Sequence, residues 1–138
     1  MRTLLCALAV TLISCTSGVM APPSGLPVTL ATTVVGIGPA SATLTAAGDS
    51  ATAIVIQAPS CAALPSADAG IRGGGLVVTL TLTQSRPIGC AVVAGSERFA
   101  MVVHQVPAGQ YAASVVERSV VGTTAKDTTL LTTTVSLP

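Results

Sequence analysis

The sequence predicts an all-β fold, namely an antiparallel β-sandwich of seven to eight short strands. From Val28 onwards the chain consists mainly of Val, Thr, Ile, Leu and Ala, interrupted by Gly and Pro. Val, Ile and Thr have restricted side-chain torsions and are favoured on the pleated surface of a sheet. Polar and apolar residues alternate with a period of two in several segments, and no segment shows a helical period of useful length.

The clearest strand covers 76–83, where apolar residues alternate with Thr79, Thr81 and Thr83. The ranges 42–46 and 130–137 repeat this alternation. Less regular candidate strands cover 28–35, 50–57, 88–94, 98–106 and 110–121.

Turn residues divide these strands. Asp49 lies in a Gly-Asp-Ser turn, Gly73-Gly74-Gly75 precedes the strand at 76–83, and Asp127 follows Lys126 in an expected hairpin turn. The range 59–75 has no clear pattern and is expected to be the longest irregular segment. It contains Cys61 near its start.

The amino terminus has the features of an export signal. Arg2 precedes an uncharged apolar run that continues to Ile13 and is too short to span a bilayer comfortably. The run ends in Leu12-Ile13-Ser14-Cys15, which resembles the lipobox of bacterial lipoproteins. That resemblance implies cleavage before Cys15 and attachment of a lipid to its sulfur.

The domain organisation follows from this interpretation: a signal peptide at 1–14, a lipid-anchored flexible tether at 15–27, and a sandwich domain at 28–138. The tether is rich in Pro, Gly and Ser. Thr16 stands where some lipoproteins carry an aspartate for retention in the inner membrane, so the resemblance slightly favours an outer membrane. The alternative is ordinary secretion after cleavage at Val19-Met20-Ala21, which would leave Pro22 as the first residue.

Export also determines how the cysteines are interpreted. Cys6 would leave with the signal peptide and Cys15 would carry the lipid, so Cys61 and Cys90 remain. In an oxidising compartment these two are expected to form a disulfide. A metal site is not expected, because the chain has a single histidine and no Cys-x-x-Cys motif.

Charge is sparse and balanced, with six basic and five acidic residues, and Arg2 would be removed with the signal peptide. No run of basic residues exists, so nucleic acid is not an expected partner. The expected contacts are the membrane, through the lipid anchor, and an envelope protein. No cofactor is expected.

One segment resembles a known domain class. Pro107-Ala108-Gly109-Gln110-Tyr111 connects two apolar segments and resembles a turn found in bacterial immunoglobulin-like and transthyretin-like domains. The resemblance implies a hairpin in which Tyr111 packs near the turn, with its hydroxyl bonded to nearby backbone. The chain differs from antibody domains because it lacks tryptophan and because Cys61 and Cys90 are close in sequence.

Catalysis is not expected. His104 is the only imidazole, and it is predicted to lie within a strand on the face opposite Phe99, Met101 and Val103. The carboxylates form no obvious pair. Instead, the sequence pairs Glu97-Arg98 and Glu117-Arg118 are expected to face each other across a hairpin.

The sequence therefore leaves three functions open. The first is a non-catalytic, lipid-anchored structural or protein-interaction module of the cell envelope, with 128–138 as a candidate edge strand that a partner extends. The second is a secreted or anchored module that binds a small ligand or a surface through the loop 61–75. The third is an enzyme that uses His104.

Overall fold

The computed structural model describes residues 25–60, 62–84 and 94–138, and within them the chain is all-β, as predicted, with no helix. Nine strands are present in the described residues: β1 (Gly25–Leu26), β2 (Val28–Val35), β3 (Ser41–Ala47), β4 (Ser50–Gln57), β5 (Ala62–Arg72), β6 (Gly75–Gln84), β7 (Ser96–Val103), β8 (Gly109–Val121) and β9 (Thr124–Leu137). The predicted strand at 88–94 lies almost wholly outside the described residues.

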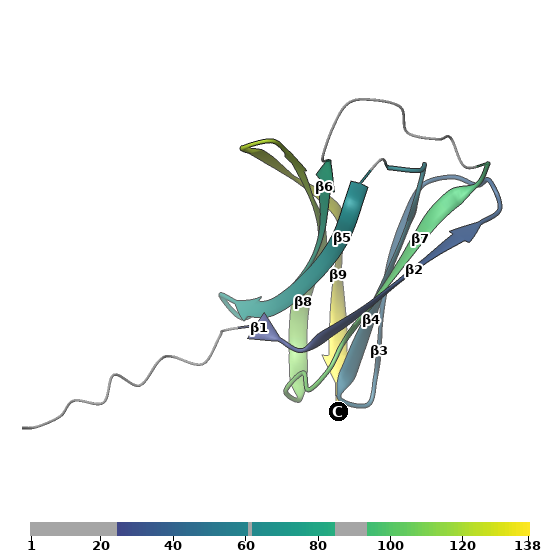
Figure 1. Cartoon of the computed structure of the whole chain (residues 1–138). Helices are drawn as coiled ribbons and strands as arrows, with labels where there is room; N and C mark the ends of the chain where they lie inside the picture. Colours follow the sequence, from purple (N-terminus) through teal and green to yellow (C-terminus); the bar gives the residue numbers. More distant parts are fainter. Residues whose placement is uncertain (1–24, 61, 85–93) are drawn as a thin grey trace, which may run out of the picture.

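The strands form two sheets that pack in a sandwich-like arrangement (Figure 1), as predicted. One sheet has five strands in the order β1-β5-β6-β8-β9, and the other has four in the order β2-β7-β4-β3. The chain crosses between the sheets at Pro27, so that Gly25 and Leu26, two residues of the predicted tether, already pair with β5.

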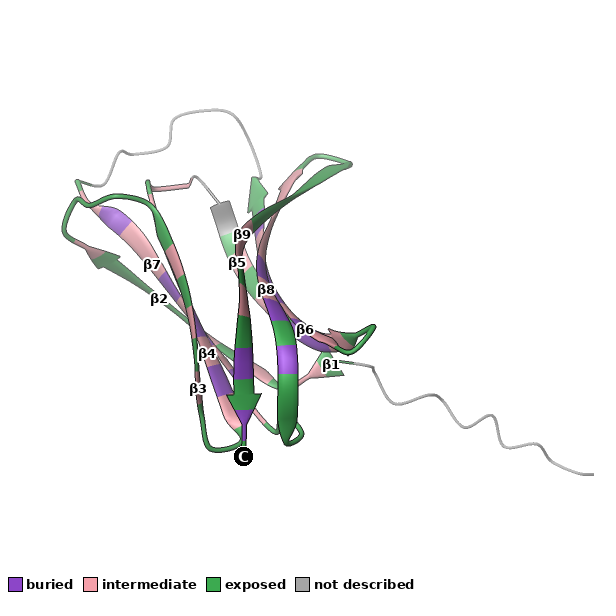
Figure 2. Ribbon diagram, turned by 180° about the vertical axis from the view of Figure 1, so that it is seen from behind, coloured by how far each residue is buried: buried purple, intermediate pink, exposed green. Residues whose placement is uncertain are grey.

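The core lies between the facing surfaces of the two sheets. In β6 the residues at 76, 78, 80 and 82 are buried, as the alternation predicts. Opposite them lie buried residues of the four-stranded sheet, among them Val55, Phe99 and Met101. Figure 2 shows buried positions interspersed with exposed and intermediate ones along the strands, and exposed residues at the turns. Burying these side chains supplies the main favourable term in folding.

The prediction that 59–75 is irregular is wrong over most of this range, because β5 occupies Ala62–Arg72. Its residues have low strand propensity, so the sequence alone does not predict a strand here. However, Pro65, Ala67 and Ala69 alternate and pair with Leu82, Leu80 and Val78 of β6. Small residues fit beside the large side chains of β6, and this packing overrides the weak propensity.

The predicted turn after β5 is confirmed, since Gly73 and Gly74 both have positive φ and join Arg72 to Gly75.

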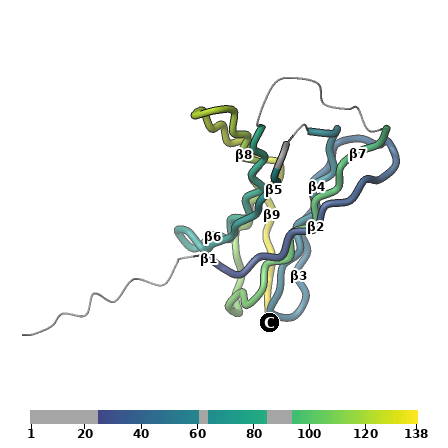
Figure 3. Tube along the Cα trace, viewed as in Figure 1, coloured from purple at the N-terminus to yellow at the C-terminus, as the bar shows by residue number. Residues whose placement is uncertain are grey.

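The prediction of a purely antiparallel sandwich is also wrong at one pair, because β6 and β8 are parallel. Between them, β7 lies in the other sheet (Figure 3). The chain therefore enters β8 in the same direction as it entered β6. All other strand pairs among the described residues are antiparallel.

For the same reason the expected hairpin between the strands around Pro107 does not exist. β7 and β8 belong to different sheets, so Pro107-Ala108-Gly109 lies in a connection from one layer to the other. The local expectation for Tyr111 is confirmed: its side chain is buried, and its hydroxyl donates to the carbonyl oxygen of Pro107 at 2.8 Å.

Candidate functional site

The four-stranded and five-stranded sheets each end in an edge strand on the same side of the molecule. Among the described residues, β3 pairs only with β4, and β9 pairs only with β8. Both lie on the side turned to the viewer in Figure 2, close to each other but in separate sheets. The predicted edge strand at 128–138 is therefore found at an edge, as the last part of β9.

A register shift interrupts β9 on this side. Val115 pairs with Leu131, but Val116 pairs with Thr129, which leaves Leu130 as an extra residue. Such a bulge bends its strand and redirects side chains. Leu130 and Leu131 are both partly buried against the core.

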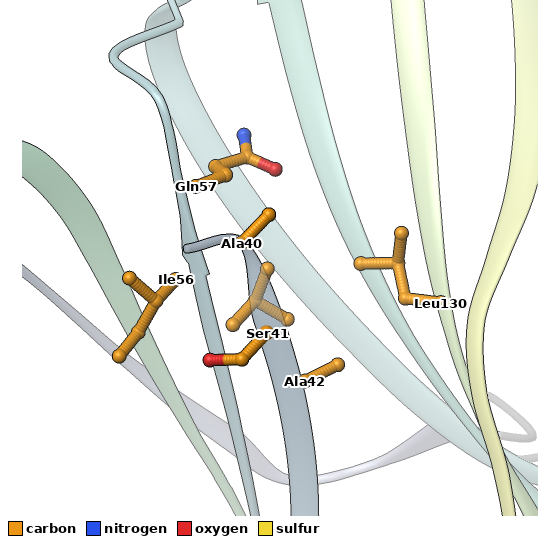
Figure 4. Close-up of a pocket in the computed structure, with 7 residues that line it drawn as sticks. Ala40, Ser41, Ala42, Ile56, Gln57 and Leu130 are labelled. Atoms are coloured by element: carbon orange, nitrogen blue, oxygen red, sulfur yellow. The ribbon is translucent and has the colours of Figure 1, made fainter. Parts of the chain in front are cut away.

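A small cavity of about 190 Å³ opens beside the bulge. It lies between β9 and the adjoining ends of β3 and β4, and its lining consists of Ala40, Ser41, Ala42, Val55, Ile56, Gln57 and Leu130. In Figure 4, Leu130 faces Ala40, Ala42 and Gln57 across the gap, and the hydroxyl of Ser41 points away from Leu130.

The lining of this cavity is mainly apolar. None of the described residues that line it is ionisable, and the amide of Gln57 is directed towards the gap. Its volume is of the order of the ~150 Å³ cavities that hold a benzene-sized molecule. A cavity of this size and lining suits one aliphatic or aromatic side chain.

His104 lies just after β7 rather than inside a strand. Its backbone N–H donates to the carbonyl oxygen of Pro27 at 2.8 Å, and its Nε2 lies 3.0 Å from Oγ1 of Thr29. The ring is half-buried, whereas Phe99, Met101 and Val103 are fully buried, which agrees with the predicted faces. Among the described residues no carboxylate bonds to the ring, so the third member of a catalytic triad is not assembled there.

The carboxylates of Glu97 and Asp49 each bond to a different serine. Oε2 of Glu97 accepts hydrogen bonds from the backbone N–H and the hydroxyl of Ser60, both at 2.9 Å. Asp49 lies in the predicted turn and accepts from the hydroxyl of Ser50 at 3.1 Å. In the described ranges no three His, Cys, Asp or Glu side chains gather as a metal site would require.

The predicted pairing of Glu97-Arg98 with Glu117-Arg118 is wrong, because β7 and β8 lie in different sheets. Arg118 instead forms a bidentate ion pair with Asp127 of β9, with N–O distances of 2.7 and 2.8 Å. Asp127 is consequently not in a turn. The turn lies at Gly122 and Thr123, and Asp127 sits within β9 opposite Arg118.

This ion pair is exposed, with 43% and 49% of the two side chains accessible. The hydrogen bonds and the charge of Arg118 lower the pKa of Asp127 below its ordinary value. The same bonds, together with the charge of Asp127, raise the pKa of Arg118. The pair lies on the outer surface of the hairpin, where solvent screens it, and it does not resemble a catalytic acid–base pair.

The remaining predicted sites are three cysteines and the loop at 61–75. Cys15, Cys61 and Cys90 lie outside the described residues. The proposed binding loop at 61–75 is instead β5 and the two-glycine turn that follows it. Within the part of the chain that the structure describes, no helix is long and apolar enough to cross a membrane.

The cavity residues were missed by sequence reasoning. Leu130-Leu131 carried the one available signal, because two adjacent large apolar residues break the alternation of the strand and indicate a bulge. Nothing in the sequence indicated that Ala40 and Gln57 would lie opposite it.

Comparisons with known proteins add no family assignment. No protein-family model matches the chain, and searches of curated proteins and of solved structures gave no significant match.

Proposed function

We propose that this chain is a non-catalytic lipoprotein of the cell envelope, anchored through Cys15, whose immunoglobulin-like sandwich presents a sheet edge to an envelope protein. The anchor and the export signal rest on the sequence of residues 1–15. The interaction role is carried by one observation, the uncharged edge at the end of β9.

An unpaired edge offers a row of backbone donors and acceptors to an added strand. From Thr128 to Pro138 the chain has no charged residue that would oppose such pairing. The adjacent cavity at Leu130 suits one apolar side chain of the added strand. Backbone pairing would then supply affinity, and the cavity would supply selectivity.

The alternative of a ligand-binding loop at 61–75 assumed that this range is irregular, whereas β5 occupies most of it. The third hypothesis, an enzyme that uses His104, has no supporting constellation in the described residues.

The proposed role can be tested with a matched pair of variants. Thr134 on β9 and Ala112 on β8 are exposed cross-strand neighbours. Thr134→Lys places a charge on the edge strand, and Ala112→Lys places the same charge one strand inward. Both proteins would be expressed in the native host and purified from its membranes in mild detergent, with the co-purifying proteins quantified.

We expect Thr134→Lys to reduce a specific co-purifying protein severalfold while Ala112→Lys leaves it unchanged, because lysine on an edge discourages strand addition. Equal recovery with both variants, after circular dichroism has shown that both fold, would exclude β9 as the docking edge.

A further inference from the structure

The free edge of β3 has features that set it apart from the other edges. β3 pairs with β4 in an unbroken register from Ser41 to Ala47. Its residues alternate between exposed and half-buried, with Thr43 and Thr45 exposed. On the same side of the molecule β9 lies close to β3, but among the described residues it forms no backbone pairing with this edge.

Natural edge strands are defended against association by charges, prolines or bulges. β5 is covered by β1 only at Ala69 and Gly70, and its remaining edge has Pro65, Asp68 and a register shift near Ala62. β9 has Lys126 and the bulge at Leu130, which protect its first part and leave only Leu131–Leu137 in regular register. β3 has none of these defences, and Asp49 is the nearest charged residue in the sequence.

The sequence of β3 is also symmetric. Residues 42–46 read Ala-Thr-Leu-Thr-Ala, which is the same in both directions. If two copies of β3 pair antiparallel about a two-fold axis at Leu44, Thr43 of one copy lies opposite Thr45 of the other. Ala42 then lies opposite Ala46. Threonine pairs across strands are favourable, and every contact occurs twice, as a two-fold interface requires.

β2, the opposite edge of the same sheet, is a weaker candidate. It is also uncharged, but Val28–Val35 has no comparable symmetry.

We infer that β3 pairs with β3 of a second copy of this chain, joining the two four-stranded sheets into one continuous sheet across a two-fold axis. A seven-residue strand buries less surface than a standard stable interface, so the dimer is weak and depends on concentration. The inference rests neither on the lipid anchor nor on β9, so its failure and that of the proposed function can be distinguished.

The test uses the purified full chain and analytical ultracentrifugation over a range of concentrations. Thr43→Lys/Thr45→Lys places like charges opposite each other in the dimer. Thr43→Glu/Thr45→Lys places the new carboxylate of each copy opposite the new ammonium group of the other. This second variant therefore restores complementarity only in the antiparallel register centred on Leu44. Thr33→Lys on β2 is the control for a charge on the other edge of the sheet.

We expect a reversible dimer for the wild type, the Glu/Lys variant and Thr33→Lys, and a dissociation constant raised about tenfold or more for the Lys/Lys variant. A wild-type chain that stays monomeric at the highest concentrations would overturn the inference. So would a dimer that the Lys/Lys variant retains, or one that Thr33→Lys abolishes. Circular dichroism confirms that each variant is folded before its association is measured.

Discussion

The hydroxyl of Tyr111 donates a hydrogen bond to the carbonyl oxygen of Pro107, with the two oxygens 2.8 Å apart. The ring is buried at the start of β8, and Pro107 lies in the connection that leaves β7. The bond therefore fixes the path of the chain where it passes from the four-stranded to the five-stranded sheet.

Removing this bond should weaken the fold measurably. Tyr111→Phe keeps the ring but leaves the Pro107 carbonyl without its partner, which should lower the free energy of unfolding by about 1 kcal/mol. Urea denaturation followed by circular dichroism measures the change. An unaltered denaturation midpoint would show that the bond does not hold the connection.

The two leucines at positions 80 and 64 provide a direct test of the core. Leu80 is 0% exposed in β6, whereas Leu64 is 78% exposed in β5. Leu80→Ala should lower the free energy of unfolding by about 2–5 kcal/mol through lost burial and a residual cavity. Leu64→Ala should change it by no more than about 0.5 kcal/mol. Similar losses for both variants would contradict the placement of β6 at the centre of the sheet.

The ion pair between Arg118 and Asp127 predicts a specific pH dependence. The pKa of Asp127 is lower in the folded protein than its ordinary value of 3.8. The pair therefore contributes stability above pH 3.8, and this contribution is lost as the pH falls through the folded-state pKa.

Asp127→Asn should consequently be slightly less stable than the wild type at about pH 6, and the difference should disappear in strong acid and shrink in high salt. Denaturation midpoints of both proteins across this pH range provide the measurement. A difference that persists in strong acid would assign the effect to something other than the carboxylate charge.

A disulfide between Cys61 and Cys90 is the proposed covalent link of the domain. If it forms, the double variant Cys61→Ser/Cys90→Ser should lose about 3–4 kcal/mol of stability in the chain-entropy model. Reductant should lower the wild type to the same level and leave the variant unchanged. A wild type that does not respond to reductant would remove the disulfide from the account.

Alternation identified those parts of the fold in which side chains differ strongly between faces. β6 shows this best, because Leu76 and Leu80 point inward and Thr81 and Thr83 point outward. β5 was missed because its inward positions are held by Pro65, Ala67 and Ala69, which have little intrinsic preference for strands. Only the neighbouring leucines and valine of β6 make those small residues suitable there.

The connection around Pro107 shows a second limit. Its turn residues predict a change of chain direction, and they also predicted the role of Tyr111. They do not determine whether the next strand pairs with the previous one or crosses to the other sheet, because this depends on contacts between distant segments. The parallel pairing of β6 with β8 could not be foreseen for the same reason.

The candidate site was predictable only in part. The uncharged edge at the end of β9 followed from the threonine-rich sequence without lysine after Thr128. The cavity depends on Leu130 in β9 meeting residues of β3 and β4, which are far away in the sequence. Such a meeting of two sheets is a property of the packing and not of any one segment.

The central claim is that the sandwich is tethered by a lipid at Cys15, and the intact mass of the mature protein tests it most directly. The protein would be extracted from membranes of its native host and measured by mass spectrometry. The account predicts a chain that starts at Cys15 and carries additional lipid mass. A lipid-free chain that starts near Pro22 would contradict the anchor and make the protein a secreted module.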